Sequence, residues 1–177
     1  EEENSKGQLI LPTYQQLIAI RNILKFLSSP PREGLYRQFV FQKGFAGTGK
    51  TTIVAKWVMK SLGYGPTEIL ATGHTESSST LINQQFGINA NPTVEQITEK
   101  LNSDSIGTAK VIIIDEVSGL TKDEFDSVVT ALNNYNTRNK TDIKILGLGD
   151  PNQMTPGGLS KNFFEDYRNV DEYGSMT

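Results

Sequence analysis

Residues 39–52 read Phe-Val-Phe-Gln-Lys-Gly-Phe-Ala-Gly-Thr-Gly-Lys-Thr-Thr. The first five predict a strand, and the glycine-rich residues from 44 onward match the pattern G-x-x-x-x-G-K-[ST]. Apolar residues then recur at helical spacing, namely Ile53, Val54, Trp57, Val58 and Leu62. A phosphate-binding loop requires this order of strand, loop and helix. The alternative interpretation is a glycine-rich turn that carries an exposed lysine.

The chemistry of a phosphate-binding loop gives most of its positions a role. Its backbone N–H groups turn toward phosphate oxygens, and the start of the following helix adds partial positive charge. Lys50 would neutralise charge on the β and γ phosphates, and the Thr51 hydroxyl would bind Mg²⁺. We therefore expect Mg²⁺–ATP to bind here. The expected contacts with the nucleotide are Gly44, Gly47, Thr48, Gly49, Lys50, Thr51 and Thr52.

Strands and helices alternate along the rest of the chain. A Thr13-x-x-Gln16 capping box predicts a helix with Leu17, Ile18, Leu24 and Leu27 on one face, and Thr121-x-x-Glu124 caps another with Phe125, Val128, Val129 and Leu132 inward. Further strands are expected at 68–72, 111–114 and 144–148, and further helices at 77–85 and 93–101. This alternation predicts an α/β fold, a doubly wound and mostly parallel sheet with helices on both faces.

Two further groups of polar residues follow predicted strands. Asp115 and Glu116 end the run Val-Ile-Ile-Ile, which places both carboxylates at the carboxyl edge of the sheet, where such folds bind ligands. We expect Asp115 to hold Mg²⁺ through a water and Glu116 to activate the attacking water. Residues 149–153, Gly-Asp-Pro-Asn-Gln, follow the next strand. Asp150 would lie at the nucleotide, and Gln153 could bind the γ-phosphate or the attacking water.

Composition limits the remaining possibilities. The 177 residues suit one domain over 1–177, with 1–8 as a polar tail and 161–177 as a tail or the start of a missing second lobe. There is no Cys and a single His, which excludes disulfides and thiolate zinc sites. Residues 1–60 carry a net charge of +5 and residues 61–177 a net charge of −8, so a uniformly basic nucleic-acid coat is excluded. No apolar run could span a membrane, and the cytoplasm is the expected compartment.

The three motifs together resemble motifs I, II and III of superfamily 1 helicases, most closely the RecD-like and Dda-like group. They are residues 44–52, Asp-Glu-Val-Ser at 115–118, and residues 149–153. The resemblance covers about residues 9–160 and implies a P-loop NTPase fold, the first RecA-like lobe only. Residues 11–15 look like the family's Q motif, which makes Gln15 the expected adenine contact. Gln16 is the alternative adenine contact, unless it serves only the capping box.

The resemblance also implies contacts with single-stranded nucleic acid, DNA in preference to RNA. Thr75, His74 and Thr93 stand where the family binds the strand. His74 could equally be a plain loop residue. Gly73-His74-Thr75 stands where the family usually reads Ala-Pro-Thr. Glu95 stands in place of a usual His, and Gly119 in place of a usual Met after Asp-Glu-x-Ser. A carboxylate at 95 would repel a nucleic-acid backbone.

The expected function is therefore the ATP-binding motor lobe of a helicase, which hydrolyses ATP with Mg²⁺ at Lys50, Glu116 and Gln153. Its second lobe, or a partner protein, would supply the arginine that stabilises the transition state, since neither Arg138 nor Arg168 lies in a matching motif. Alone, the lobe should be a weak ATPase. The alternatives are an ATP-binding scaffold or regulatory module without efficient turnover, and another P-loop phosphotransferase such as a nucleoside kinase.

Overall fold

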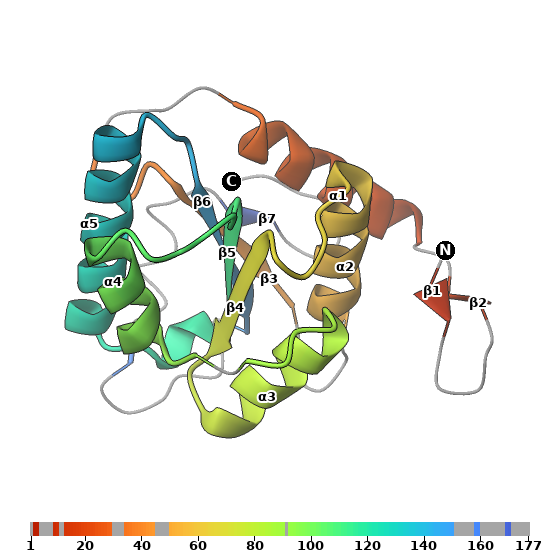
Figure 1. Ribbon diagram of the computed structural model, residues 1–177. Coiled ribbons are helices and arrows are strands. Elements are labelled where there is room, and N and C mark those ends of the chain that lie inside the picture. Colours follow the sequence, from red (N-terminus) through yellow and green to blue (C-terminus); the bar gives the residue numbers. More distant parts are fainter. Residues whose placement is uncertain are drawn as a thin grey trace.

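The computed structural model describes residues 2–3, 9–10, 13–29, 34–44, 50–90, 92–150, 158–159 and 169–170. A five-stranded sheet forms the centre of the chain, with the strand order β4-β5-β6-β3-β7 and every neighbouring pair parallel (Figure 1). Its strands are β3 (Phe39–Lys43), β4 (Ile69–Gly73), β5 (Val111–Asp115), β6 (Lys144–Gly149) and β7 (Asn169–Val170). The expected strands thus form at the expected places, within a residue at their ends.

Helices cover both faces of this sheet. In Figure 1, α1 (Tyr14–Leu27) and α2 (Lys50–Leu62) lie on one side, and α4 (Val94–Asn102) and α5 (Lys122–Asn139) lie on the other. A shorter helix, α3 (Glu76–Gln85), follows β4, and a 3-10 turn, η1 (Val117–Gly119), follows β5. The doubly wound α/β fold expected from the alternation is therefore confirmed.

Threonine capping boxes begin four of the helices. Thr13, Thr75, Thr93 and Thr121 each accept a hydrogen bond from a backbone N–H three residues on, and the side chain at that position bonds back to the threonine N–H. Each box satisfies two N–H groups that a helix start otherwise leaves unpaired. The boxes expected at Thr13 and Thr121 are confirmed.

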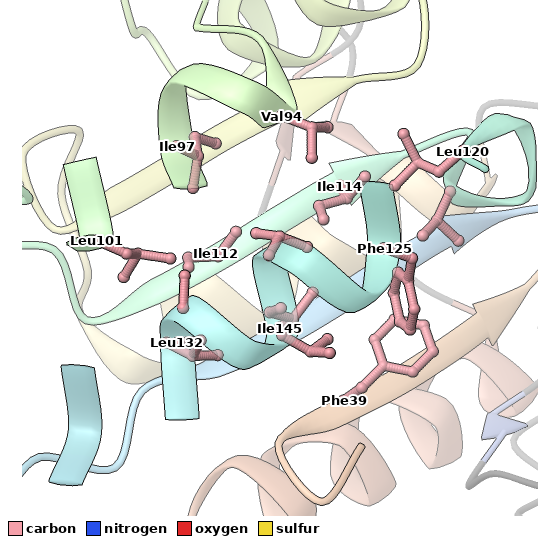
Figure 2. Close-up of a cluster of buried hydrophobic side chains, with 14 of the residues drawn as sticks. Phe39, Val94, Ile97, Leu101, Ile112, Ile114, Leu120, Phe125, Leu132 and Ile145 are labelled. Atoms are coloured by element: carbon pink, nitrogen blue, oxygen red, sulfur yellow. The ribbon is translucent and has the colours of Figure 1, made fainter. Parts of the chain in front are cut away.

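Alternate residues of the central strands point into two separate cores. Ile112 and Ile114 of β5 pack with α4 and α5, where Phe39 meets Phe125 edge to face at 4.8 Å between ring centroids (Figure 2). Val111 and Ile113 of the same strand belong to the opposite core with α1, α2 and α3. A strand buried on both faces needs this uninterrupted β-branched run.

The inward face of α1 differs from the one expected. Leu17 is 51% exposed, and Leu24 and Leu27 lie at the margin of the core, whereas the buried residues are Gln16, Ala19, Ile20, Ile23 and Phe26. Apolar residues occupy more than one side of this helix, so spacing alone defines no single direction. Contact with α2 and the sheet then selects the side that carries Ile23 and Phe26.

Both ends of the chain contribute short strands. β1 (Glu2–Glu3) pairs with β2 (Leu9–Ile10) in an antiparallel two-stranded sheet. Figure 1 shows this small sheet outside the main fold, next to the start of α1. β7, which falls within the expected C-terminal tail 161–177, pairs with β3 at the edge of the main sheet. Residues 169–170 thus belong to the sheet of this lobe, because β3 offers a free edge for a parallel neighbour.

Candidate functional site

Three chain segments meet where β3, β5 and β6 end. The Gly44 N–H, just after β3, donates to the Gly149 carbonyl at the end of β6 over 3.0 Å. A Cβ placed at Gly149 would lie 3.6 Å from the Cα of Glu116, just after β5. Since β6 lies between β3 and β5, it brings the start of the phosphate loop within reach of the carboxylates. The structure therefore joins Gly44, Glu116 and Gly149 at one edge of the sheet.

Asp115 and Glu116 differ in their surroundings although they are adjacent. Asp115 is half-buried, and one of its carboxylate oxygens accepts the Glu116 N–H at 3.0 Å. Burial, with a smaller contribution from the charge of Glu116, raises the pKa of Asp115 to about 6, against the lowering effect of that hydrogen bond. A poorly solvated carboxylate favours a bound cation, and carboxylate and hydroxyl oxygens are the ligands that Mg²⁺ prefers. Asp115 therefore fits a Mg²⁺ ligand.

Glu116 holds an unusual backbone conformation. Its φ of 51° and ψ of 42° place it in the left-handed region, from which it caps η1. A non-glycine residue there costs on the order of 1–3 kcal/mol, and such residues are enriched at functional sites. Asp104 and Lys140 adopt the same region after α4 and α5. The side chain of Glu116 is exposed. The turn thus presents a carboxylate to solvent at the edge where the phosphate loop begins.

We expect Asp115→Asn to stabilise the nucleotide-free chain at high pH. The pKa of Asp115 in the folded chain, about 6, exceeds its ordinary value of 3.8, so its stabilising proton is fully bound below about pH 4 and is lost as the pH rises through 6. At pH 8 the variant should be more stable by about 1 to 3 kcal/mol, and the difference should shrink toward pH 4. Urea unfolding without Mg²⁺ at several pH values measures this.

Asp123→Asn is the matched control, since Asp123 is an exposed aspartate at the start of α5. It should not reproduce the pH-dependent gain. If the free energy of unfolding of Asp115→Asn followed that of the wild-type chain at every pH, burial would not disfavour the charged form of Asp115.

The structure describes only part of the expected phosphate loop. Gly44 ends the described part of the first segment, and Lys50, Thr51 and Thr52 are the first residues of α2. Gly47, Thr48 and Gly49 lie outside the described residues, and so does Gln153. Asp150 is described and half-buried directly after β6. The roles of all these residues toward the nucleotide stay predictions.

The two glutamines of the expected Q motif have separate environments. Gln16 is buried, and its side-chain oxygen accepts the Thr13 N–H at 2.8 Å, which completes the capping box. Gln15 is exposed on the first turn of α1. The capping role of Gln16 leaves Gln15 as the glutamine available for an adenine base, which stays a prediction.

Thr75 and Thr93, two of the expected nucleic-acid contacts, cap helices in the structure. The Thr75 hydroxyl caps α3 and the Thr93 hydroxyl caps α4, although both side chains are exposed. Glu95 is exposed one residue beyond the start of α4. The Thr93 hydroxyl can still donate its own hydrogen to a phosphate, whereas the Thr75 hydroxyl already donates to Ser78 Oγ at 3.0 Å and would have to give up that bond. Contacts of both threonines with nucleic acid stay predictions.

His74 and Gly119, which both depart from the helicase motifs, are in contact. The half-buried His74 ring lies against Gly119, where a Cβ would come within 3.0 Å of three ring atoms. The sequence showed each departure separately, and only the fold brings them together. The only signal in the sequence was that a bulky residue at 74 and a glycine at 119 occur in the same chain, as a pair of matched size would.

Gln42 is a second residue that motif analysis missed. It is fully buried two residues before Gly44, and neither its side-chain oxygen nor its nitrogen has a hydrogen-bond partner among the described residues. Buried amide groups in folded proteins usually have hydrogen-bond partners, so Gln42 is unusual among the described residues of this core. A glutamine directly after three apolar residues of the predicted strand was the sequence signal.

The sequence matches a known protein family, and the structure resembles solved structures. A family model described as an AAA domain matches residues 34–166. No curated protein matches the chain. The structure is similar to Pif1 from Bacteroides sp in complex with ADP-AlF4, at a TM-score of 0.51 and 17% identity over 91% of this chain. A double mutant of the Bacteroides Pif1 helicase matches at 0.51 and 18% identity, also over 91% of the chain.

At these identities the likeness shows the fold, a P-loop NTPase fold like that of one helicase lobe. The chain spans 37% of the length of each of these two Pif1 chains. Among the residues that the structure describes, no helix is both long and apolar enough to cross a membrane.

Proposed function

Because the chain belongs to the AAA domain family, we propose that it is the ATP-binding motor lobe of a superfamily 1 helicase. In the complete helicase, Mg²⁺-dependent ATP hydrolysis would be coupled to movement along single-stranded nucleic acid, DNA in preference to RNA, in the cytoplasm. The observation that carries this proposal is the meeting of Gly44, Glu116 and Gly149 at one edge of the sheet. A motor needs its phosphate loop, its carboxylates and a γ-phosphate sensor at one place, and these three residues each belong to a different one of the three motifs.

Each part of the site has a separate task in the proposed reaction. Lys50 and the N-terminus of α2 would hold the phosphates, with Thr51 and Asp115 as the Mg²⁺ ligands. Bound there, Mg²⁺ would neutralise negative charge on the β and γ phosphates. Glu116, exposed on its left-handed turn, would accept the proton of the attacking water. Gln15 would read the adenine, and Gln153 would sense the γ-phosphate.

The arginine for the transition state would come from the second lobe or a partner. Arg138, near the C-terminal end of α5, donates to the Leu101 carbonyl and to Asp104, each at 3.0 Å. It thereby ties α5 to the end of α4. This use leaves it no role at the opposite edge of the sheet, where Glu116 lies.

A second candidate is an ATP-binding regulatory module that does not bind single strands. The specific observation in its favour is that the Thr75 hydroxyl donates inside its own helix cap, to Ser78 Oγ at 3.0 Å, while the Glu95 carboxylate is exposed two residues after Thr93. Such a module would bind ATP equally well. It would show no response to nucleic acid.

Turnover of ATP with and without a single-stranded oligonucleotide tests the proposal. The 177-residue chain should hydrolyse ATP slowly, because an absent transition-state arginine typically costs on the order of 10³ to 10⁵ in rate. An oligodeoxynucleotide should raise this rate, with weak binding and a shallow salt dependence, since few phosphates are neutralised. Phosphate release measures the rate, with a strand-displacement assay beside it.

The outcomes separate the candidates. A rate of ATP hydrolysis that neither DNA nor RNA changes would favour the regulatory module. Robust unwinding by the chain alone would contradict the proposed need for a second lobe. Transfer of phosphate to a nucleoside rather than to water would point to the phosphotransferase.

A further inference from the structure

The His74 imidazole fills the space that a side chain at position 119 would need. A Cβ at Gly119 would lie within 3.0 Å of the ring atoms Cγ, Cδ2 and Nε2. Real Cβ atoms essentially never approach other heavy atoms so closely. Since Cγ is attached directly to Cβ of His74, the ring cannot escape by a small rotation. Gly119 and His74 are therefore matched in shape.

Gly119 is tied in turn to the Glu116 backbone. The Gly119 N–H donates to the Glu116 carbonyl over 2.9 Å, which closes the turn of η1. The Glu116 N–H bonds the Asp115 carboxylate at 3.0 Å at the other end of the same turn. Because Glu116 sits in the left-handed region, it holds this conformation only while the surrounding contacts maintain it.

His74 itself is fixed from the side of β4. The backbone N–H of His74 donates to the Asp115 carbonyl at 3.2 Å. This bond extends the pairing of β4 with β5 beyond Gly73 and Asp115. Gly73 allows Ser78 of α3 to approach so closely that a Cβ there would collide with the Ser78 hydroxyl. The backbone of His74 is thus held between β5 and the start of α3, and its ring packs against Gly119 of η1.

We infer that His74 is a positioning residue, whose ring packs on Gly119 and holds the Glu116 carboxylate in place for hydrolysis. The inference rests on the proposed function, because it concerns the step that Glu116 performs. His74 touches neither nucleotide nor water in this role. Loss of the ring should therefore affect the rate of the chemical step and leave ATP affinity unchanged.

Steady-state ATP turnover by four variants of the 177-residue chain tests this inference. His74→Ala and Gly119→Ala should each lower kcat by on the order of tenfold to a hundredfold with KM for ATP within about twofold, because small misplacements of a catalytic group slow the reaction itself. In the double variant, Gly119→Ala should add little to His74→Ala, since the ring it would displace is already gone. Gly65→Ala is the control, because a Cβ there meets nothing within 4 Å.

A second readout needs no turnover. His74 is the single histidine of the chain, so its imidazole gives one resolved pair of NMR signals. These signals should shift when a non-hydrolysable ATP analogue binds with Mg²⁺, because the ring touches the turn that carries Glu116. Thermal unfolding of each variant checks that lost turnover does not reflect an unfolded chain.

Each failure has its own signature. A wild-type chain whose turnover does not exceed that of Lys50→Ala would overturn the proposed function and this inference with it. An active wild-type chain would overturn the inference alone if His74→Ala kept its kcat or raised KM instead. The same holds if Gly119→Ala were equally costly in both backgrounds, or if the histidine signals ignored the nucleotide.

Discussion

Lys50→Ala is expected to abolish measurable binding of Mg²⁺–ATP. Lys50 is the first residue of α2, which directly follows the glycine-rich loop, so its ammonium group would meet the β and γ phosphates at the positive end of the helix. Losing one to two charge-assisted hydrogen bonds should weaken binding by about 3 to 5 kcal/mol, or roughly 100-fold to 4000-fold. Titration with a fluorescent ATP analogue measures this.

Lys60→Ala is the matched control on the same helix. Lys60 is exposed at the far end of α2, and its Nζ lies 5.0 Å from the centroid of the Trp57 ring. Ten residues of helix separate the two lysines by about 15 Å, so this change should leave nucleotide affinity intact. Wild-type affinity in Lys50→Ala would show that residues 44–51 are not a phosphate loop.

The fold was predictable wherever local patterns agree with one another. The run of β-branched residues at 111–114 predicts a strand buried on both faces, and it is one, because the pattern leaves no polar face to turn outward. The capping boxes at Thr13 and Thr121 likewise locate helix starts to the residue. These signals need no knowledge of distant contacts.

The face of α1 shows where local pattern stops being sufficient. Leu17 is exposed while the polar Gln16 is buried, since the capping bond satisfies the Gln16 amide and the core selects Ile23 and Phe26. The pairing of β7 with β3 is a second case. Two residues carry too little pattern to predict a strand, and only the open edge of β3 makes one possible there.

The site was predictable as a set of motifs but not as a set of contacts. Motif spacing predicts that Asp115 and Glu116 end a strand, and they do. It does not reveal the left-handed conformation of Glu116, which arises from the turn into η1. Nor does it relate His74 to Gly119, since the two are 45 positions apart and meet only because β4 pairs with β5.

Glu116→Gln should separate ATP binding from ATP hydrolysis. The amide keeps the shape of the carboxylate and cannot accept a proton from water, so turnover should fall by about 10² to 10⁴ while nucleotide affinity is retained. The backbone should tolerate the change, because glutamine meets the same steric demand in the left-handed region as glutamate. The experiment compares phosphate release with analogue titration on the same preparation.

Glu99→Gln provides the matched control, because Glu99 is an exposed glutamate on α4, and it should hydrolyse ATP at the wild-type rate. Glu116→Gln has a further expected consequence at its neighbour. The charge of Glu116 contributes to the raised pKa of Asp115, so its removal should lower that pKa and reduce the loss of stability at high pH. Unchanged turnover together with that altered pH profile would place Glu116 beside the reacting groups but remove it from proton transfer, and Gln153 would then be the next residue to test.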